Sequence, residues 1–365
     1  RSCRKNGTPY MEKAPVPYPP VLHSLASAST ITWLIHQKFE LSIPLYRQEK
    51  EWEALGLRLS RATMSNWLLV VYRDWLVHIV HRLKLELLKQ RYLHIDETHV
   101  QVLKEPGRKN TSDSYMWVYC SIRDAVNPIR YFEYQPGRSG KYPEAFLREY
   151  EGYIHTDAYS GYNAVSGVKR CLCYTHLRRA FVDALPKDIH NSEASKPAEA
   201  ILRLNQLFNI ESELEALPPD QKKKERLIRE KPLLEAFWSW AEKSAIGELP
   251  KSKLSKAFHY ALNNREGFWN YLEDGNCSIS NSLAENCIRP FVIGRKNWLF
   301  SGSPKGAEAS AGIYTLVETA KANGLAPMKY IKYILSDMPG SAFLEHPEYL
   351  DDYLPWNPLV KEFCR

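Results

Sequence analysis

Residues 91–103, "RYLHIDETHVQVL", mark the point at which the pattern of the chain changes from helical to strand-like. Asp96 lies in the middle of this stretch, where a charged residue is more often an exposed-face residue than a ligand. A second aspartate, Asp157, ends a later strand in "GYIHTDAYSGY" (152–162). It can be a turn residue or one carboxylate of a metal site. The rest of the chain has to decide between these interpretations.

The residues around both aspartates predict an α/β fold. Runs rich in β-branched and aromatic residues predict strands over 91–103, 114–122, 129–135, 153–157 and 169–175. Helices are predicted over 141–151 and from His176 onward. This order indicates a mixed sheet with helices packed on it.

Periodicity and composition divide the chain into six segments. These are a proline-rich tail or linker (1–27), a helical region (28–90), the first part of a sheet-containing core (91–189), an all-helical insertion (190–275), the second part of the core with the Glu285 helix (276–325) and a C-terminal tail (326–365). Within the helical region, Gly56 predicts a turn and Ser60 the N-cap of a second helix. This pattern is typical of a helix-turn-helix, with an ordinary helical hairpin as the alternative.

The bulk properties exclude a membrane protein and a disordered chain. Of 365 residues, 44% are hydrophobic and 25% charged, which is typical of a globular protein. The longest apolar runs are far too short to span a bilayer. Seven scattered cysteines indicate a reducing compartment, so we expect a cytoplasmic protein without a membrane partner. The net charge of +7 is compatible with a polyanionic partner without requiring one.

A set of carboxylates suggests metal-dependent phosphodiester chemistry. If the sheet is ribonuclease H-like, its first and fourth strands are neighbours, and Asp96 and Asp157 meet at one edge. Glu285 begins a helix after the insertion and could approach the same place, but the third position has four rivals: Glu266, Asp274, Glu308 and Glu318. Clustered carboxylates repel one another. Two Mg²⁺ ions remove that repulsion and stabilise the charges of phosphodiester cleavage.

The chain resembles the bacterial DDE transposases of the insertion-sequence sixty-six family. Matching blocks are "IPLYRQEKEWEALGLRLSRATMSNW", "LHIDETHVQVL", "HTDAYSGYNAV", "CYTHLRRAF", "YLPWN" and a long, very specific block over 282–324. The resemblance implies a ribonuclease H-like catalytic core over 91–189 and 276–325, interrupted by the helical insertion. It also implies that Asp96, Asp157 and Glu285 are catalytic ligands of two Mg²⁺, or Mn²⁺.

The same resemblance implies the activity and the partners. We expect hydrolysis at insertion-sequence ends, and attack of the freed 3′-hydroxyl on target DNA by a homo-oligomer, with accessory proteins from the same element as further partners. Family members usually carry an upstream helical segment and a cysteine-rich, zinc-type module. This sequence shows neither, so we expect an N-terminally truncated member. A catalytically silent DNA-binding remnant and a nuclease without strand transfer are the alternatives.

Further residues are candidates for DNA binding. In the helical region, a recognition helix would present Arg61 and Asn66 in its first turns. Near the carboxylates, the candidates are His176, Arg178, Arg179, Arg289, Arg295, Lys296 and Trp298. Trp298 could stack on an unpaired base or belong to the core, and Arg289 could form a salt bridge instead. His94 and His155 each precede an aspartate by two residues, so each shares its strand face, and we expect both to pack against the site.

Overall fold

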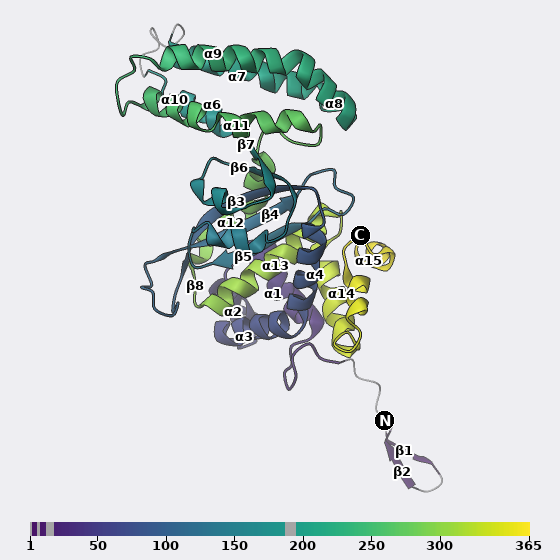
Figure 1. Cartoon of the computed structure of the whole chain (residues 1–365). Coiled ribbons are helices and arrows are strands. Elements are labelled where there is room, and N and C mark those ends of the chain that lie inside the picture. Colours follow the sequence, from purple (N-terminus) through teal and green to yellow (C-terminus); the bar gives the residue numbers. More distant parts are fainter. Residues whose placement is uncertain (1, 6–7, 12–17, 187–194) are drawn as a thin grey trace.

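A six-stranded mixed sheet lies at the centre of the molecule, between two groups of helices (Figure 1). The structure is a computed structural model, and it describes residues 2–5, 8–11, 18–186 and 195–365. The strands are β3 (Tyr92–Val102), β4 (Asp113–Ser121), β5 (Arg130–Gln135), β6 (Gly152–Thr156), β7 (Val168–Leu172) and β8 (Phe300–Ser301). Helix α5 (Lys141–Phe146) precedes β6 and ends earlier than the predicted residue 151.

The strand order is β5-β4-β3-β6-β7, and the short β8 pairs with the end of β3. Strands β3, β4 and β5 are antiparallel neighbours, whereas β6 and β7 run parallel to β3. The central strand β3 is covered on both faces, because the consecutive side chains Leu93, His94 and Ile95 are all buried. A polar or charged group in this strand therefore costs free energy to bury unless it has a hydrogen-bond or charge partner. The predicted α/β class with a mixed sheet is confirmed.

The N-terminal helices lie on the side of the sheet opposite to residues 196–269 (Figure 1), and the last of them contacts the strand β5. They are α1 (Ala28–Ile35), α2 (Leu45–Ala54), α3 (Arg61–Val71) and α4 (Val77–Leu88). Ser60 caps α3 as predicted, because its side chain accepts a hydrogen bond from Thr63 N–H at 3.1 Å. Gly56 follows α2 with a φ of +86°, and Leu57 N–H donates to the Trp52 carbonyl at 2.8 Å. This left-handed turn ends α2 and directs the chain into α3.

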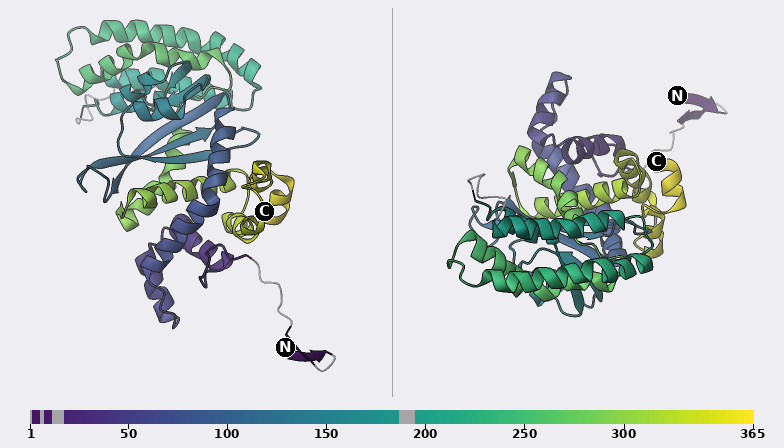
Figure 2. Two further views of the ribbon diagram at one scale, coloured as in Figure 1. Left: turned by 60° about the horizontal axis from the view of Figure 1, so that its bottom comes forward. Right: turned by 90° about the horizontal axis from the view of Figure 1, so that it is seen from above.

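The remaining helices fall into two sets. The insertion and the helix that leads into it contain α6 (Tyr174–Val182), α7 (Lys196–Glu213), α8 (Pro219–Glu225), α9 (Lys231–Ala245), α10 (Lys253–Asn263) and α11 (Arg265–Trp269). The chain then returns to the sheet and ends with α12 (Ser282–Trp298), α13 (Pro304–Ala322), α14 (Pro327–Asp337) and α15 (Pro358–Cys364). Figure 2 shows the first set stacked at one end of the molecule, away from α2 and α3.

The insertion has its own hydrophobic core. Leu204, Phe237 and Trp238 pack with Leu177 and Phe181 of α6, and this cluster is separate from the core that lies under the sheet. Helix α6 was assigned to the sheet-containing segment 91–189 by its sequence, but its apolar face belongs to the insertion. The sequence did not predict this packing, because amphipathic periodicity indicates that a helix has a buried face but not which element that face contacts.

Helix α13 protects the edge of the sheet. The side-chain oxygens of Thr315 and Thr319 accept hydrogen bonds from the N–H groups of Phe132 (2.8 Å) and Arg130 (3.0 Å) in the edge strand β5. An edge strand with free N–H groups is prone to pair with other chains, and these two threonines remove that liability.

Both chain ends differ from the predicted tails. Within 1–27, β1 (Ser2–Lys5) pairs with β2 (Thr8–Met11), and the Pro20 carbonyl accepts a hydrogen bond from Trp75 Nε1 at 2.8 Å. The prolines at positions 15 and 17 lie outside the described residues. The segment 326–365 forms α14 and α15, which contribute buried side chains to the main core. Among the described helices, none has the length and apolarity that crossing a membrane would require.

Candidate active site

Two neighbouring parallel strands bring Asp96 and Asp157 together. In the register of β3 and β6, Leu93 pairs with Ile154 and His94 with His155. Continuing this register by two residues places Asp96 beside Asp157, which directly follows β6. Backbone N–H groups orient both carboxylates: Glu97 N–H donates to Asp96 Oδ1 and Tyr159 N–H donates to Asp157 Oδ1, each at 2.9 Å. The two aspartates thus lie side by side, one within β3 and the other just after β6.

Asn281, the residue before α12, attaches the Glu285 helix to the same part of β3. Its Nδ2 donates to the Ile95 carbonyl at 2.8 Å, and its Oδ1 pairs with His94 Nδ1 at 2.9 Å. The Asn281 side chain is buried, and Glu285 follows one helical turn later. This connection explains how a residue far along the chain approaches Asp96. Sequence reasoning missed Asn281. An Asn just before a helix is a recognisable capping signal, but this side chain makes no capping hydrogen bond and binds β3 instead.

The pKa of Asp96 reflects its acidic neighbours. Burial, together with the charges of Glu97, Asp157 and Glu285, raises the pKa of Asp96 to about 7, against the hydrogen bond from Glu97 N–H, which lowers it. All three neighbours are therefore close enough to repel an ionised Asp96. The side chains of Asp157 and Glu285 remain 30% and 29% exposed, so the group is accessible from solvent.

Basic side chains surround the acidic group. Arg138 Nη2 lies 3.9 Å from Asp157 Oδ2, Arg179 Nη2 lies 3.9 Å from Glu285 Oε2, and His176 Nδ1 lies 3.7 Å from Glu285 Oε1. The neighbouring Cys173 thiol and the charges of Glu285 and Asp157 raise the pKa of His176. A surface hollow is lined by Arg138, Asp157, His176 and Arg179 together with Tyr260 of the insertion. This hollow combines acidic and basic groups in one accessible place.

Glu97 and Arg138 are components that the sequence did not reveal. Arg138 Nε and Nη2 both contact Glu97 Oε1, at 2.6 and 2.5 Å, and the Tyr162 hydroxyl also donates to Glu97. Burial raises the pKa of the Glu97 carboxyl, while Tyr162 and Arg138 oppose that shift. Glu97 is thus a paired, buried carboxylate, and it adds to the negative charge around Asp96. Its only sequence signal was the pair Asp96–Glu97 within one strand.

The other predicted DNA-binding residues lie in several places. Arg178 Nε donates to Asn205 Oδ1 of α7 at 2.7 Å, so it contacts the insertion. Arg295 donates to Thr98 Oγ1 at 3.2 Å, which places it along β3 on the face of Asp96. Trp298 is partly buried against the main core, with Lys38 Nζ 5.4 Å from its ring centroid. Arg61, Asn66, Arg289 and Lys296 are exposed.

The rival carboxylates have different neighbours. Asp274 accepts a hydrogen bond from the Tyr92 hydroxyl at 2.7 Å, near the start of β3. Glu318 pairs with Lys321 within α13, and Glu308 lies near Tyr72. Glu266 is exposed on α11. Only Glu285, of these five, contributes to the pKa shift of Asp96.

The donor set fits a hard divalent cation. Asp96, Asp157 and Glu285 offer carboxylate oxygens, which Mg²⁺ prefers. Glu285 Oε1 is buried and has no hydrogen-bond partner within the described residues. A cation would stabilise both the unpaired Glu285 oxygen and an ionised Asp96, whose charge burial disfavours.

Comparison with known proteins gives the family. The profile described as Transposase IS66 family matches residues 23–309, a range that includes Asp96, Asp157 and Glu285. Two relatives from Sinorhizobium fredii (strain NBRC 101917 / NGR234) are the uncharacterized proteins y4hP and y4qI. The chain is 25% identical to y4hP over 95% of its own length and 28% identical to y4qI over 91%. It spans 65% and 63% of these relatives, which is less than two thirds of their length. Because the family profile covers most of its residues, the chain belongs to the IS66 family of transposases.

Proposed function

We propose that this protein is a DDE-type DNA transposase with a ribonuclease H-like catalytic core, and that Asp96, Asp157 and Glu285 hold two Mg²⁺ or Mn²⁺ ions. The proposal rests on the register that places Asp96 of β3 beside Asp157 at the end of β6. It also rests on the Asn281 contact that holds the start of the Glu285 helix against β3, and on the charge of Glu285 acting on Asp96. The strand order β5-β4-β3-β6-β7, with three antiparallel strands followed by two parallel ones, supports the fold assignment. Membership of a transposase family supports the reaction.

The side chains have distinct tasks in this reaction. The bound ions would activate the attacking oxygen and stabilise the leaving oxygen of the phosphodiester. The strands hold Asp96 and Asp157 in a fixed relation, and Asn281 holds the start of the Glu285 helix against β3. His176 and Arg179 lie close to Glu285, where they can contact phosphate oxygens of a bound strand.

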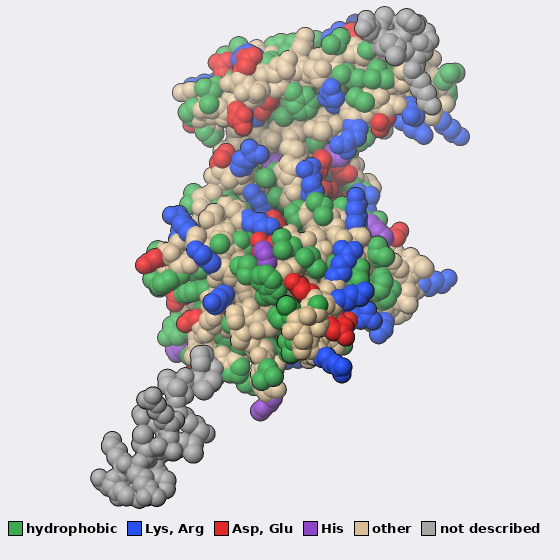
Figure 3. All heavy atoms as spheres, turned by 180° about the vertical axis from the view of Figure 1, so that it is seen from behind, with side chains coloured by type: hydrophobic (Ala, Val, Ile, Leu, Met, Phe, Trp, Pro, Cys, Tyr) green, Lys and Arg blue, Asp and Glu red, His purple; other side chains and the backbone are tan. Residues whose placement is uncertain are grey.

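Binding of the element ends needs a larger surface. Helices α2 and α3 form a helix-turn-helix-like pair that presents Arg61 and Asn66 to solvent, on the far side of the sheet from the insertion (Figure 1). Figure 3 shows Lys and Arg side chains over the face of the molecule that it draws, including the waist between the insertion and the sheet. These groups can bind the DNA backbone without reading its sequence.

The assembly follows from the reaction. Strand transfer requires two element ends to be held together, so we propose a homo-oligomer as the active unit, with accessory proteins of the same element as further partners. Action on bacterial DNA would place the protein in the cytoplasm.

The test is an assay with labelled end DNA and Mg²⁺ or Mn²⁺. We expect wild-type protein to nick the end and to join it to target DNA. Asp157→Asn and Glu285→Gln should lose at least a hundredfold in rate while keeping their fold by circular dichroism. Glu266→Gln, on the exposed face of α11, is the matched control and should cleave normally.

Three outcomes would contradict parts of the proposal. Normal cleavage by Asp157→Asn would remove the carboxylate assignment. DNA binding without metal-dependent nicking on cognate end DNA would favour a catalytically silent remnant. Cleavage without products joined to target DNA would indicate a nuclease that lacks strand transfer.

A further inference from the structure

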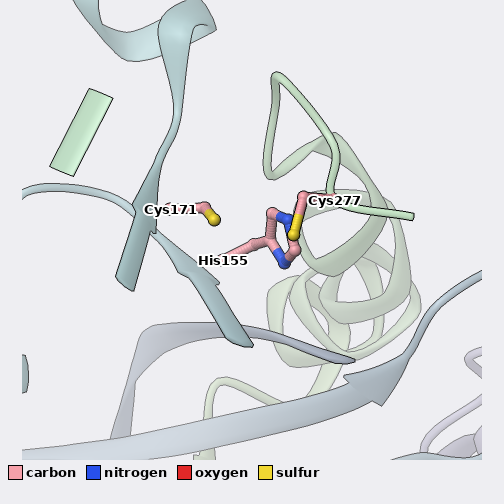
Figure 4. Close-up of side chains that lie close together, drawn as sticks. All are labelled: His155, Cys171 and Cys277. Carbon is pink, nitrogen blue, oxygen red and sulfur yellow. The ribbon is translucent and has the colours of Figure 1, made fainter. Parts of the chain in front are cut away.

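A cluster of side chains that could hold a metal ion lies inside the protein, apart from the three carboxylates. His155 of β6, Cys171 of β7 and Cys277 of the segment before α12 are all buried, and their ligand atoms lie within 4.8 Å of one another (Figure 4). The three residues come from separate parts of the chain, so no sequence motif predicts them. None of them belongs to the carboxylate group around Asp96.

The hydrogen bonds of His155 leave the correct ring nitrogen for a metal. Its Nδ1 lies 3.2 Å from the Leu93 carbonyl, to which it can only donate, so Nδ1 carries the proton. The unprotonated Nε2 accepts a hydrogen bond from Ser278 N–H at 2.9 Å. A metal-binding histidine usually donates its other N–H to a carbonyl or carboxylate, and Leu93 supplies that group here. His94, stacked at 4.2 Å, further restrains the ring.

The two thiols supply the soft ligands. A hydrogen bond with Cys171, together with burial, raises the pKa of the Cys277 thiol. Binding of a cation as a thiolate complex would release the Cys277 proton. Two cysteines and a histidine select zinc over Mg²⁺, because thiolate and imidazole are poor ligands for Mg²⁺.

The surroundings provide an access route and a place for a fourth ligand. A surface hollow lined by His94, Asn276 and Ser278 reaches one member of the cluster, Cys277. Water from this hollow can complete a tetrahedral site with three protein ligands. Metal on His155 Nε2 would replace the hydrogen bond from Ser278 N–H, so the segment around Ser278 must shift locally when metal binds.

We propose that His155, Cys171 and Cys277 form a structural zinc site that ties the segment before α12 to β6 and β7. Asp157 lies two residues after His155, and Glu285 lies eight residues after Cys277. Zinc would therefore connect the two elements that carry these carboxylates, at a point that takes no part in the proposed DNA chemistry.

The first measurement is the metal content of the wild-type chain. Protein expressed with added zinc and dialysed into Mg²⁺ buffer should retain about one zinc per chain by mass spectrometry of the metal. Cys171→Ser and Cys277→Ser should each lose most of it. Cys287→Ser is the matched control, because the Cys287 thiol forms its hydrogen bond with Cys120 and neither residue belongs to this cluster. Asp157→Asn should keep its zinc, which separates this site from the proposed catalytic one.

A second measurement starts from the wild-type protein, so its thiol titration does not depend on whether the variants fold. Titration of the native wild-type thiols with a mercurial should release zinc to a chromogenic chelator as about two thiols react. Cobalt-loaded protein should show a thiolate-to-cobalt charge-transfer band, absent from Cys277→Ser. Zinc-free wild-type protein, a folded Cys171→Ser/Cys277→Ser variant that keeps its zinc, or a Cys171–Cys277 disulfide in the native protein would overturn the proposal.

Discussion

The imidazole rings of His94 and His155 stack with their centroids 4.2 Å apart and their planes 10° from parallel. Each ring lies two residues before an aspartate, on neighbouring parallel strands. Burial lowers the pKa of His94 well below its usual value, with a further contribution from His155, so the His94 ring is neutral. His94 hydrogen-bonds with Asn281, and His155 hydrogen-bonds with the Leu93 carbonyl and the Ser278 N–H. The pair therefore forms a layer between the sheet and the segment that leads to Glu285.

Replacing Asn281 should misplace Glu285. Asn281→Ala removes the hydrogen bonds to His94 and the Ile95 carbonyl, and leaves buried polar groups unpaired at a cost of about 1–3 kcal/mol. We expect a lower urea midpoint and a loss of end cleavage of at least tenfold. Ser280→Ala, an adjacent and less buried change, is the control. Full cleavage by a measurably destabilised Asn281→Ala would show that this connection does not position Glu285.

Arg138 and Glu97 should behave as a coupled pair. The Glu97 side chain is only 2% exposed, so Arg138→Gln leaves its charge without its cation. Because Arg138 itself is 40% exposed, we expect a moderate loss of about 1–3 kcal/mol in the free energy of unfolding. Adding Glu97→Gln to this variant should recover most of the loss. A double-mutant cycle by urea denaturation measures the coupling, and additive effects would contradict it.

The insertion should lose stability as the pH rises. Burial, with the nearby charge of Glu211, raises the pKa of Glu230 to about 8, so the folded protein holds a proton that the unfolded chain releases near pH 4.5. This contribution is complete below pH 4.5 and is lost as the pH rises through 8. Glu230→Gln should therefore be more stable than wild type at pH 8, by on the order of 2 kcal/mol.

The same substitution should have little effect at pH 5, where wild-type Glu230 is protonated. Gln retains an oxygen that can accept the Tyr271 hydroxyl, which donates to Glu230 at 2.6 Å. Glu213→Gln, at an exposed ion pair with Arg229, controls for the loss of a surface charge. Urea denaturation between pH 5 and pH 9 gives the free energy of unfolding of the wild type and of Glu230→Gln as a function of pH. If the two curves are parallel, Glu230 does not hold a proton in the folded protein.

Arg61 should contribute to DNA affinity without reading sequence. Its side chain is exposed in the first turn of α3, where it can contact phosphate. Arg61→Ala should weaken binding to end DNA and reduce the slope of log affinity against log salt by about 1. Fluorescence anisotropy at several salt concentrations measures this, and Arg73→Ala is the control because Arg73 pairs with Asp74. An unchanged slope would exclude a phosphate contact by Arg61.

Removing divalent ions should lower the thermal stability of the wild type. Added Mg²⁺ binds the folded carboxylates and raises the unfolding temperature with concentration. Asp157→Asn should lose this response, and without Mg²⁺ it should unfold at or above the wild-type temperature, because one repulsive charge is gone. Thermal scans with EDTA or Mg²⁺ distinguish these states. An identical Mg²⁺ response in both proteins would place the ion elsewhere.

Local sequence patterns predicted many of the strands and helices of the fold. The strand predicted over 91–103 is β3, because alternating β-branched and aromatic residues suit a sheet wherever it packs. Gly56 forms the turn after α2 and Ser60 caps the start of α3, as predicted, because caps and left-handed turns depend only on neighbouring residues. The segment 326–365 was mistaken for a tail, because short helices broken by prolines bury their apolar side chains only against the rest of the protein.

The sequence by itself determined the approximate positions of strands β3 to β7, the turn and cap between α2 and α3, and the placement of Asp96 in one strand and Asp157 at the end of another. Only the tertiary structure decided that Glu97 pairs with Arg138, that Asn281 joins α12 to β3, and that His155, Cys171 and Cys277 share one buried place. Local patterns act through backbone geometry over a few residues. Contacts between distant segments depend instead on strand order and helix packing, which no short stretch of the chain encodes.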